Sequence, residues 1–368
     1  MKSPNAVRRN IRFWKSSAVL ATAVALGLTG CASSPGATDA GASDAEEEIG
    51  VSLIIKTSSN PFFVAMQAGA ESAAAELGVK LTVAAGRDLV DEDTQIQAIE
   101  NAIAQGQKGI LITPNGPSVL NAIEQARDAG LYVIALDDPP NPADAVDITF
   151  ATDNRMAGNL IGEWTAGALK GEDAVIALID LSAETNASVD FERDQGFLEG
   201  MGIDTNDPDL NGDEDATGSY SGGAYEIVCN QDSDGAEDGG RTAMETCLSL
   251  SDDINVVYTI NEPAAAGAYE ALSALGKESG VLFVSVDGGC AGVGLIGDGV
   301  ISATSQQYPL KMAELGVEAI HALVTTGQAP ENTNGLDFFN TGVALITDQP
   351  VDGVTSLDSA KGAELCWG

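Results

Sequence analysis

Polar and aromatic side chains recur in this sequence in the segments that follow short apolar runs. Carboxylates, amides and an arginine offer the paired hydrogen-bond donors and acceptors that suit neighbouring hydroxyl groups. Aromatic faces pack against the apolar C–H face of a sugar ring. The pattern therefore predicts a binding site for a polyol. The segments that carry these side chains are 60–63, 137–140, 191–193, 261–263, 287–289 and 305–309.

The apolar runs are the expected strands of a sheet, and helical patterns separate them. Near-continuous β-branched runs of this length are typical of parallel strands buried on both faces. Ala-rich amphipathic segments between them end at Gly78, Gly106 and Gly130, as a helix C-cap does. This alternation predicts a doubly wound α/β fold, in which ligands bind at the carboxyl ends of the strands. The expected strands are 51–55, 80–83, 109–112, 132–136, 175–179, 255–258 and 281–286, and the expected helices include 63–77, 93–105 and 118–129.

The N-terminus has the layout of an export signal. Five basic residues precede an apolar stretch, 17–28, that is too short to span a membrane. It ends in Leu28-Thr29-Gly30-Cys31, which resembles a bacterial lipoprotein signal, so we expect residues 1–30 to be removed and Cys31 to carry lipid. An ordinary secretory signal with an incidental cysteine is the alternative. The small, polar and acidic residues 31–47 are expected to form a flexible tether.

These features predict a folded body outside the cytoplasm, anchored by lipid to the outer face of the bacterial cell membrane. That location excludes cytosolic enzymes and DNA-binding regulators. Removal of the signal leaves 12 basic and 55 acidic residues, a charge that repels nucleic acid phosphates, so no nucleic acid partner is expected. The remaining 338 residues are enough for two domains, and we expect a monomer.

Four cysteines follow the expected lipidation site, which fits an oxidising compartment. Four cysteines allow three pairings. We favour Cys229–Cys247, which closes a short acidic loop, and Cys290–Cys366, which pins the C-terminus. Metal binding is the alternative, but no CxxC or Cys/His spacing supports it.

One acidic segment resembles the beginning of a calcium loop. Oxygen-bearing side chains at alternate positions, with glycine at the sixth, suit a hard cation. The glutamate that closes such a loop is missing, because the twelfth position is Gly218. We therefore expect a solvated acidic insertion and no metal, with calcium as the weaker alternative. The candidate calcium ligands are Asp207, Asp209, Asn211 and Asp213.

Motifs for catalysis or cofactor binding are weak in this chain. The segment 292–297 matches GxGxxG, but it does not follow the first expected strand, and a lone match is weak. No GxSxG, Walker A or HExxH motif occurs. We expect no cofactor and no enzymatic activity.

Four runs carry a resemblance to a known family. They are Asn-Glu-Pro-Ala-Ala-Ala-Gly-Ala-Tyr at 261–269, Val-Asp-Gly-Gly-Cys at 286–290, Ala-Thr-Ser-Gln-Gln-Tyr-Pro-Leu-Lys at 303–311 and the terminal Cys-Trp-Gly at 366–368. From about residue 51 onward the chain resembles type I periplasmic sugar-binding proteins, the ribose-binding-like solute receptors of ABC importers. It is most similar to their fructose-binding branch.

The resemblance implies two α/β lobes joined by three crossing segments. We expect the crossings near 153–154, 307–308 and 327–333. The N-terminal lobe would then comprise 48–152 plus 308–330, and the C-terminal lobe 153–307 plus 331–368. A sugar would bind between the lobes and close them by hinge motion.

The resemblance also implies which side chains bind the sugar. The phenylalanines would stack on it, the aspartates would accept hydrogen bonds, the arginine would donate them, and the amides would do both. The implied residues are Asn60, Phe62, Phe63, Asp137, Arg193, Asn261, Asp287 and Gln307.

Two further candidate residues concern the identity of the sugar. Ribose receptors place an arginine after the first of these aspartates, whereas this chain has Asp138. An acidic residue reverses the hydrogen-bonding character there, so ribose itself is not the expected ligand. Lys56 on the first strand could restore a donor, or it could simply pair with a nearby carboxylate.

The implied function is a receptor that captures a monosaccharide, with fructose as the first candidate, and delivers it to an ABC transporter permease. No chemistry is performed on the sugar. The alternative is a sensor that presents the bound sugar to a membrane kinase or chemoreceptor. A neighbouring permease gene would favour transport.

Overall fold

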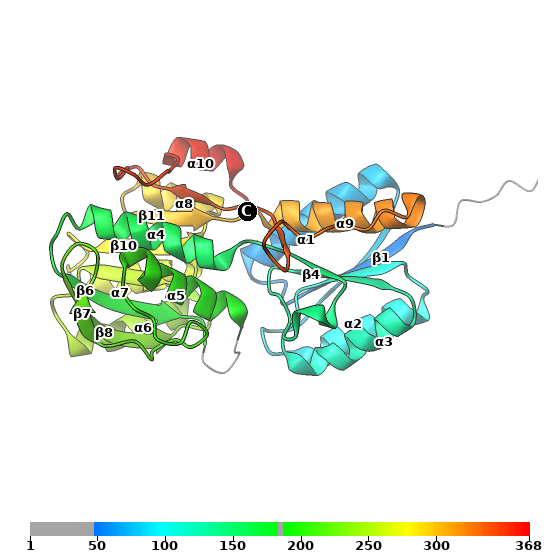
Figure 1. The fold of residues 1–368 in the computed structure, drawn as a ribbon, viewed down its shortest axis with the longest axis horizontal. Helices are drawn as coiled ribbons and strands as arrows, with labels where there is room; N and C mark the ends of the chain where they lie inside the picture. Colours follow the sequence, from blue (N-terminus) through cyan, green and yellow to red (C-terminus); the bar gives the residue numbers. More distant parts are fainter. Residues whose placement is uncertain (1–47, 183–186) are drawn as a thin grey trace, which may run out of the picture. The chain divides into compact units, whose positions relative to one another are not determined.

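The computed structural model describes residues 48–182 and 187–368 (Figure 1). The expected signal 1–30, the lipidation site Cys31 and the tether 31–47 lie outside the described residues. Among the helices that are described, none combines the length and the apolar character needed to cross a membrane.

The first lobe is built on a six-stranded parallel sheet in the order β12-β5-β4-β3-β1-β2. Successive residues of β1, an interior strand next to the edge strand β2, face opposite cores: Leu53 and Ile55 pack with α1 and α9, and Ile54 packs with α2 and α3. The strand is therefore buried on both faces, as its continuous apolar run predicts. The elements are β1 (Gly50–Ile55), α1 (Pro61–Leu77), β2 (Lys80–Ala85), α2 (Glu92–Ala104), β3 (Gly109–Ile112), η1 (Pro117–Val119), α3 (Leu120–Asp128), β4 (Tyr132–Leu136), η2 (Ala143–Ala145), β5 (Ile148–Ala151), α9 (Pro309–Thr326) and β12 (Phe339–Asn340).

The second lobe has a seven-stranded sheet in the order β13-β11-β10-β9-β6-β8-β7, in which only the two edge pairings are antiparallel. Leu178 packs with α4 and α5, and the adjacent Ile179 packs with α6 and α7. The elements are α4 (Asn154–Ala168), β6 (Ala174–Asp180), α5 (Ser188–Met201), β7 (Thr217–Ser219), β8 (Ala224–Asp232), α6 (Glu237–Leu250), β9 (Val256–Thr259), α7 (Glu262–Ala274), β10 (Leu282–Asp287), α8 (Cys290–Gly297), β11 (Ala303–Gln306), β13 (Ala344–Ile346) and α10 (Ser359–Leu365).

Helices α4 and α5 approach each other through glycines. A Cβ on Gly158 would lie 2.1 Å from the Arg193 carbonyl oxygen, and a Cβ on Gly196 would lie 2.4 Å from the Arg155 carbonyl oxygen. No real side chain fits at such distances, so the two backbones are in direct contact. This contact fixes the position of α5, which carries Arg193.

The chain crosses between the two sheets at three places. It leaves β5 for α4 through 152–153, and it leaves β11 for α9 through 307–308. The third crossing lies at 341–343, so the expected position at 327–333 is wrong. The reason is β12, which pairs with β5 and places the Phe339 ring 4.9 Å from that of Phe150. Residues 331–340 therefore belong to the first lobe, and not to the second lobe as expected.

The cysteines pair as we favoured. Cys229–Cys247 joins β8 to α6, and Cys290–Cys366 joins the start of α8 to the chain after α10. Both bonds lie in the second lobe. The second one holds the last residues of the chain against that lobe.

The double substitution Cys229→Ser/Cys247→Ser is expected to lower the free energy of unfolding by about 3 kcal/mol. The bond closes a loop with a sequence separation of 18, and its removal gives the unfolded chain more conformational freedom. Thermal unfolding followed by circular dichroism measures the effect. An unchanged Tm would show that this bond contributes nothing to stability.

Candidate functional site

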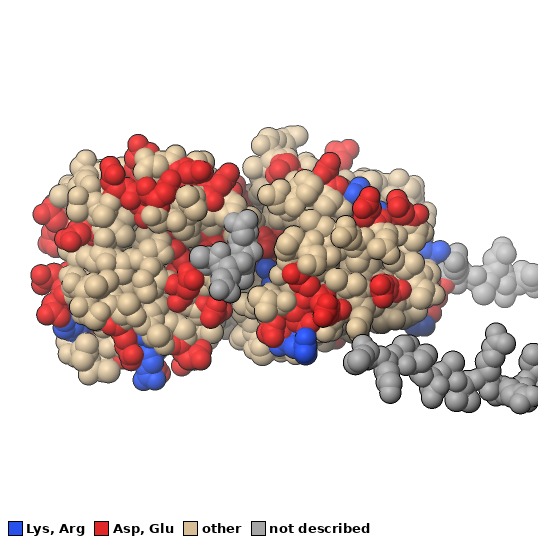
Figure 2. Space-filling view, turned by 90° about the horizontal axis from the view of Figure 1, so that it is seen from below, with Lys and Arg blue, Asp and Glu red and all other residues tan. Residues whose placement is uncertain are grey.

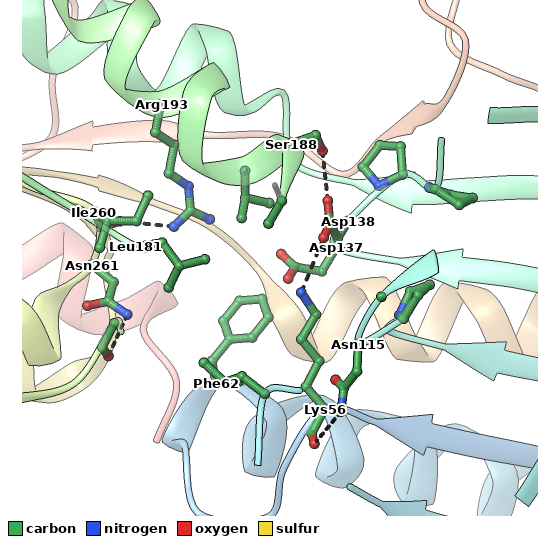
Figure 3. Close-up of a pocket in the computed structure, with 18 of the residues that line it drawn as sticks. Lys56, Phe62, Asn115, Asp137, Asp138, Leu181, Ser188, Arg193, Ile260 and Asn261 are labelled. Carbon is green, nitrogen blue, oxygen red and sulfur yellow. Dashed lines mark hydrogen bonds and ion pairs between the residues drawn. The ribbon is translucent and has the colours of Figure 1, made fainter. Parts of the chain in front are cut away.

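A cavity of about 440 Å³ lies among residues from both lobes (Figure 3). Its volume is within the range of small-molecule sites. The strand ends of both sheets supply its walls, as expected for parallel sheets. All ten residues expected from the sequence line it: Lys56, Asn60, Phe62, Phe63, Asp137, Asp138, Arg193, Asn261, Asp287 and Gln307.

Two of these residues are helix caps. The Asn60 side chain accepts a hydrogen bond from the Phe62 backbone N–H at 2.9 Å and begins α1, with Pro61 in the first turn. The Asn261 side chain accepts from the Ala264 N–H at 3.0 Å and begins α7. Its Nδ2 donates to the Gly235 carbonyl at 3.0 Å. Both amides therefore hold the first turn of a helix at the cavity wall. The Asn261 side chain already has partners for its donor and its acceptor.

The two central carboxylates occupy equivalent positions, one in each lobe. Asp137 follows β4 and Asp287 ends β10, and both have a positive φ, 70° and 142°. Non-glycine residues rarely adopt such angles, and backbone strain of this kind concentrates at functional sites. Each residue is 6% exposed. The fold therefore holds both carboxylates against the cavity at a cost in backbone energy.

Burial makes these carboxylates hard to ionise. It raises the pKa of Asp137 to about 6, although the charges of Lys56 and Arg193 act in the opposite direction. Burial likewise raises the pKa of Asp287 to about 6, against Arg193 and a hydrogen bond from Gln307. Gln307 Nε2 donates to Asp287 Oδ1 at 2.8 Å, but Asp137 Oδ1 has no hydrogen-bond partner among the described residues. A buried acceptor without a partner is costly and invites a donor from a ligand.

Lys56 and Asp138 form an ion pair in the wall of the first lobe. Lys56 Nζ lies 3.2 Å from Asp138 Oδ2, and both side chains are nearly buried. Asp138 Oδ1 accepts a 2.7 Å hydrogen bond from Ser188 Oγ, at the start of α5 in the second lobe. Asp138 thus has a partner on each oxygen, one from each lobe. The sequence analysis offered Lys56 either as a donor to the sugar or as the partner of a nearby carboxylate. The structure pairs it with a carboxylate and also places it in the cavity lining.

Arg193 is held by two acceptors in the second lobe. Its Nε donates to Asn154 Oδ1 at 2.8 Å. Its Nη1 donates to the Ile260 carbonyl at 3.0 Å (Figure 3). The residue is 5% exposed and lines the cavity. Its charge lowers the pKa of both Asp137 and Asp287. A fixed guanidinium near two carboxylates can donate to a ligand hydroxyl group while keeping those carboxylates ionised.

The phenylalanines of the wall also contact an aromatic residue outside it, Trp367, which does not itself line the cavity. The rings of Phe62 and Phe63 lie 5.3 Å apart at 86°, and Phe62 also meets Trp367 at 5.5 Å and 79°. Edge-to-face arrangements of this kind are favourable for aromatic pairs. No feature of the sequence predicted that the penultimate residue, Trp367, would lie beside α1.

Sequence reasoning missed Asn115, and it named Glu262 only as part of the segment 261–263. Asn115 lines the cavity after β3, and its Oδ1 is buried without a partner among the described residues. It follows the apolar run 109–112. The expectation that ligands bind at the carboxyl ends of parallel strands could therefore have identified it. Glu262 lies behind Asp287, and burial together with the Asp287 charge raises its pKa to about 8. Its carboxylate accepts from the N–H groups of Gly288 and Gly289, at 2.9 and 3.0 Å.

The weaker calcium alternative gains no support from the geometry. In the described part of the chain, no group of three or more His, Cys, Asp or Glu side chains is placed to hold a metal ion. Asn211 turns toward the second sheet and donates to Asp180 Oδ2 at 3.1 Å, while Asp213 Oδ2 accepts from the Asp207 backbone N–H. Asp209 is exposed.

This fold and this cavity define a class of protein. A family model described as a periplasmic binding protein domain matches residues 49–329, more than half of the chain. The chain belongs to this family of two-lobed α/β binding proteins, whose members bind their ligands and do not transform them. Family membership also implies that the protein is exported.

Individual relatives are named for sugars. The chain is 27% identical over 305 residues to a D-ribose/D-allose-binding protein of Pseudomonas aeruginosa, covering 81% of this chain and 88% of that protein. It is 28% identical over 269 residues to a ribose import binding protein of Escherichia coli, covering 73% and 82%. A solute-binding protein of Actinobacillus succinogenes with bound D-allose has the same fold, with a TM-score of 0.71 and 20% identity, covering 86% of this chain and 100% of that one.

Proposed function

We propose that the protein captures a monosaccharide in this cavity and delivers it to an ABC transporter permease. The observation that carries the proposal is the buried, strained pair Asp137 and Asp287, which faces the cavity from the two lobes beside Arg193. Hydroxyl groups of a sugar can donate to both carboxylates and accept from the guanidinium. A ligand that joins both lobes in this way stabilises their closed arrangement.

The charges of the wall favour a neutral ligand. The charged residues among those that line the cavity are Lys56, Arg193, Asp137, Asp138 and Asp287, which leaves one excess negative charge when all are ionised. The face of the molecule seen in Figure 2 is also rich in Asp and Glu. A phosphorylated sugar would meet repulsion, whereas a free sugar would not. The phenylalanines offer a surface for the apolar face of a ring.

Fructose is the first candidate sugar. The chain resembles the fructose-binding branch in long sequence runs, and it has Asp138 where ribose receptors place an arginine. The Lys56–Asp138 pair, with Ser188 on the other carboxylate oxygen, occupies that part of the wall instead. A wall with a different set of donors and acceptors selects a different pattern of hydroxyl groups. Relatives named for ribose and allose make those sugars the next candidates.

We also propose that lipid on Cys31 anchors the receptor to the outer face of the cell membrane, near its permease. The support is the sequence Leu28-Thr29-Gly30-Cys31 after a short apolar stretch. Stable anchoring of this kind needs two or more acyl chains. Metabolic labelling with a fatty acid analogue tests it, because Cys31→Ser should abolish labelling and release the protein from the membrane.

Calorimetric titration tests the proposed function. The chain from Glu46 onward contains both sheets and the described hydrophobic clusters, and it would be titrated with fructose, ribose, allose, xylose, glucose, galactose and fructose 6-phosphate. We expect one-to-one binding of fructose at about micromolar Kd, or about −8 kcal/mol, and no binding of the phosphate ester. Tight binding of another sugar would retain the receptor and reject fructose. No binding of any sugar would contradict the proposal.

A further inference from the structure

The C-terminal tryptophan links the two lobes behind the cavity. We infer that Trp367 is a positioning residue for the ligand cavity, and that the Cys290–Cys366 disulfide holds it in place. The inference rests on the proposed function for its ligand, and it concerns residues that do not themselves line the cavity.

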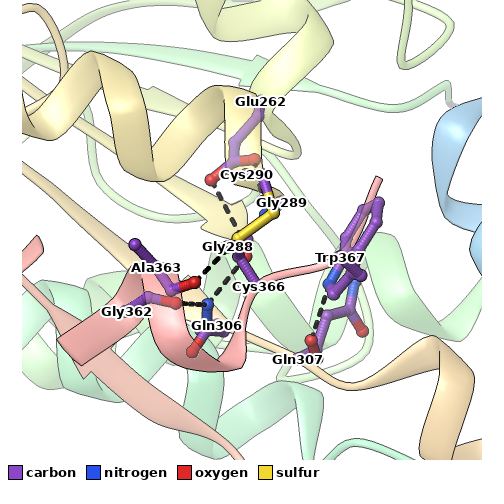
Figure 4. The surroundings of a disulfide bond; sticks show 10 residues. All are labelled: Glu262, Gly288, Gly289, Cys290, Gln306, Gln307, Gly362, Ala363, Cys366 and Trp367. Atoms are coloured by element: carbon purple, nitrogen blue, oxygen red, sulfur yellow. Dashed lines mark hydrogen bonds between the residues drawn. A yellow bond between two sulfur atoms is a disulfide. The ribbon is translucent and has the colours of Figure 1, made fainter. Parts of the chain in front are cut away.

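The second lobe holds the end of the chain through covalent and hydrogen bonds (Figure 4). The disulfide joins Cys366 to the first residue of α8, and the Cys290 N–H donates to the Trp367 carbonyl at 2.9 Å. Gln306 Nε2 donates to the Gly362 carbonyl at 3.1 Å and to the Gly288 carbonyl at 2.8 Å. The backbone of Trp367 is therefore fixed relative to β10 and β11.

The indole reaches from this anchor into the core of the first lobe. Trp367 is 6% exposed and packs in the hydrophobic cluster that contains α1, β1 and α9. Its ring meets the Phe62 ring edge to face at 5.5 Å. Its Nε1 donates at 2.8 Å to the carbonyl oxygen of Gln307, in one of the crossings between the lobes. Trp367 thus contacts the first lobe through its ring, a crossing through its Nε1 and the second lobe through its backbone carbonyl.

The ring contact and the hydrogen bond of the indole are both made to residues of the cavity wall. Phe62 and Gln307 line the cavity, and Gln307 Nε2 also donates to Asp287 Oδ1 at 2.8 Å. Loss of the indole would free the Phe62 ring to rotate and the Gln307 backbone to shift, so the Asp287 carboxylate would lose a fixed partner. A wall that must be ordered on binding gives weaker affinity than a wall that is already ordered.

The test uses Trp367→Phe, Trp367→Ala and the double substitution Cys290→Ser/Cys366→Ser in the chain from Glu46 onward. We expect the alanine and the double variant to weaken fructose binding about tenfold, because they remove an edge-to-face contact and a buried hydrogen bond. The phenylalanine variant keeps a ring without the N–H group, so its affinity should be intermediate. Calorimetric titration gives Kd, and circular dichroism gives Tm for each variant.

The other disulfide supplies a matched control. Cys229→Ser/Cys247→Ser also removes a bond within the second lobe, but neither cysteine lines the cavity or contacts Trp367 in the described structure. We expect it to lower Tm while changing Kd less than twofold. Equal weakening by both disulfide variants would overturn the inference, as would an unchanged Kd for Trp367→Ala.

A ligand-independent measurement separates this inference from the proposed function. The chain from Glu46 onward has two tryptophans, Trp164 and Trp367, which are both buried. Acrylamide quenching of their fluorescence should rise in Cys290→Ser/Cys366→Ser and stay unchanged in the control disulfide variant. If the unaltered chain binds no sugar, the proposed function fails. Unchanged quenching in the Cys290→Ser/Cys366→Ser variant would show that the disulfide does not hold Trp367.

Discussion

Arg193→Ala is expected to weaken binding of the proposed sugar, fructose, about 150-fold while the fold is retained. Arg193 is the only arginine among the described residues that line the cavity. Hydrogen bonds from a charged group contribute about 1.5–3 kcal/mol each, and a loss of about 3 kcal/mol corresponds to the stated change in Kd. The substitution also removes a charge that lowers the pKa of Asp137 and Asp287, so both carboxylates become harder to ionise. Calorimetric titration at pH 7.5 measures the effect.

Arg155→Ala is the matched control for this prediction. Arg155 lies on α4 in the same lobe, where it pairs with Glu199 at 2.6 Å and donates to the Pro208 carbonyl, outside the cavity. We expect its removal to change Kd less than twofold. Arg193→Lys should give an intermediate Kd, since it keeps the charge but loses the guanidinium geometry that reaches Asn154 and Ile260. Equal effects of the two alanine variants would reject the assigned role of Arg193.

The fold was predictable from the sequence because most of its interior strands are buried on both faces. Continuous apolar runs such as 109–112 and 132–136 are typical of buried parallel strands. The structure forms β3 and β4 at these two runs. The third crossing was not predictable in the same way. β12 has two residues, and it follows a segment rich in Gly, Pro and Asn that resembles a linker. Its place in the first sheet depends on packing of Phe339 against Phe150, which only the three-dimensional arrangement reveals.

The positions of the candidate site residues were predictable, but their partners were not. Parallel strands bring their carboxyl ends to one edge, so residues after different strands converge. The sequence could not show that the Asn261 amide is occupied by a helix cap and by Gly235, or that Asp138 is shared between Lys56 and Ser188. It also could not place Trp367, because a residue after the last helix reaches the wall only through a disulfide and tertiary packing.

Lowering the pH from 7.5 to 5 is expected to have two opposite effects. It should weaken binding of the proposed sugar, fructose, and it should raise the free energy of unfolding of the ligand-free protein. The folded pKa values of Asp137 and Asp287, about 6, lie above the ordinary value of 3.8. Between about pH 4 and pH 6 the folded protein therefore binds more protons than the unfolded chain, so the free energy of unfolding rises as the pH falls through this window. The pKa of Glu262 is about 8, so this residue extends the pH range in which the folded protein binds more protons up to about pH 8. Tm of the ligand-free chain should increase accordingly.

Fructose affinity is expected to change in the opposite direction because a hydroxyl donor binds an ionised carboxylate. Below pH 6 each carboxylate that must lose a proton on binding weakens the affinity by about tenfold per pH unit. Asp137→Asn mimics the protonated side chain, so it should bind weakly at pH 7.5 and show a flatter pH dependence. Asp144→Asn alters an exposed carboxylate of the same lobe outside the cavity and should behave as the unaltered chain does. Affinity that stays constant from pH 7.5 to 5 would show that neither buried aspartate accepts from the sugar as a carboxylate.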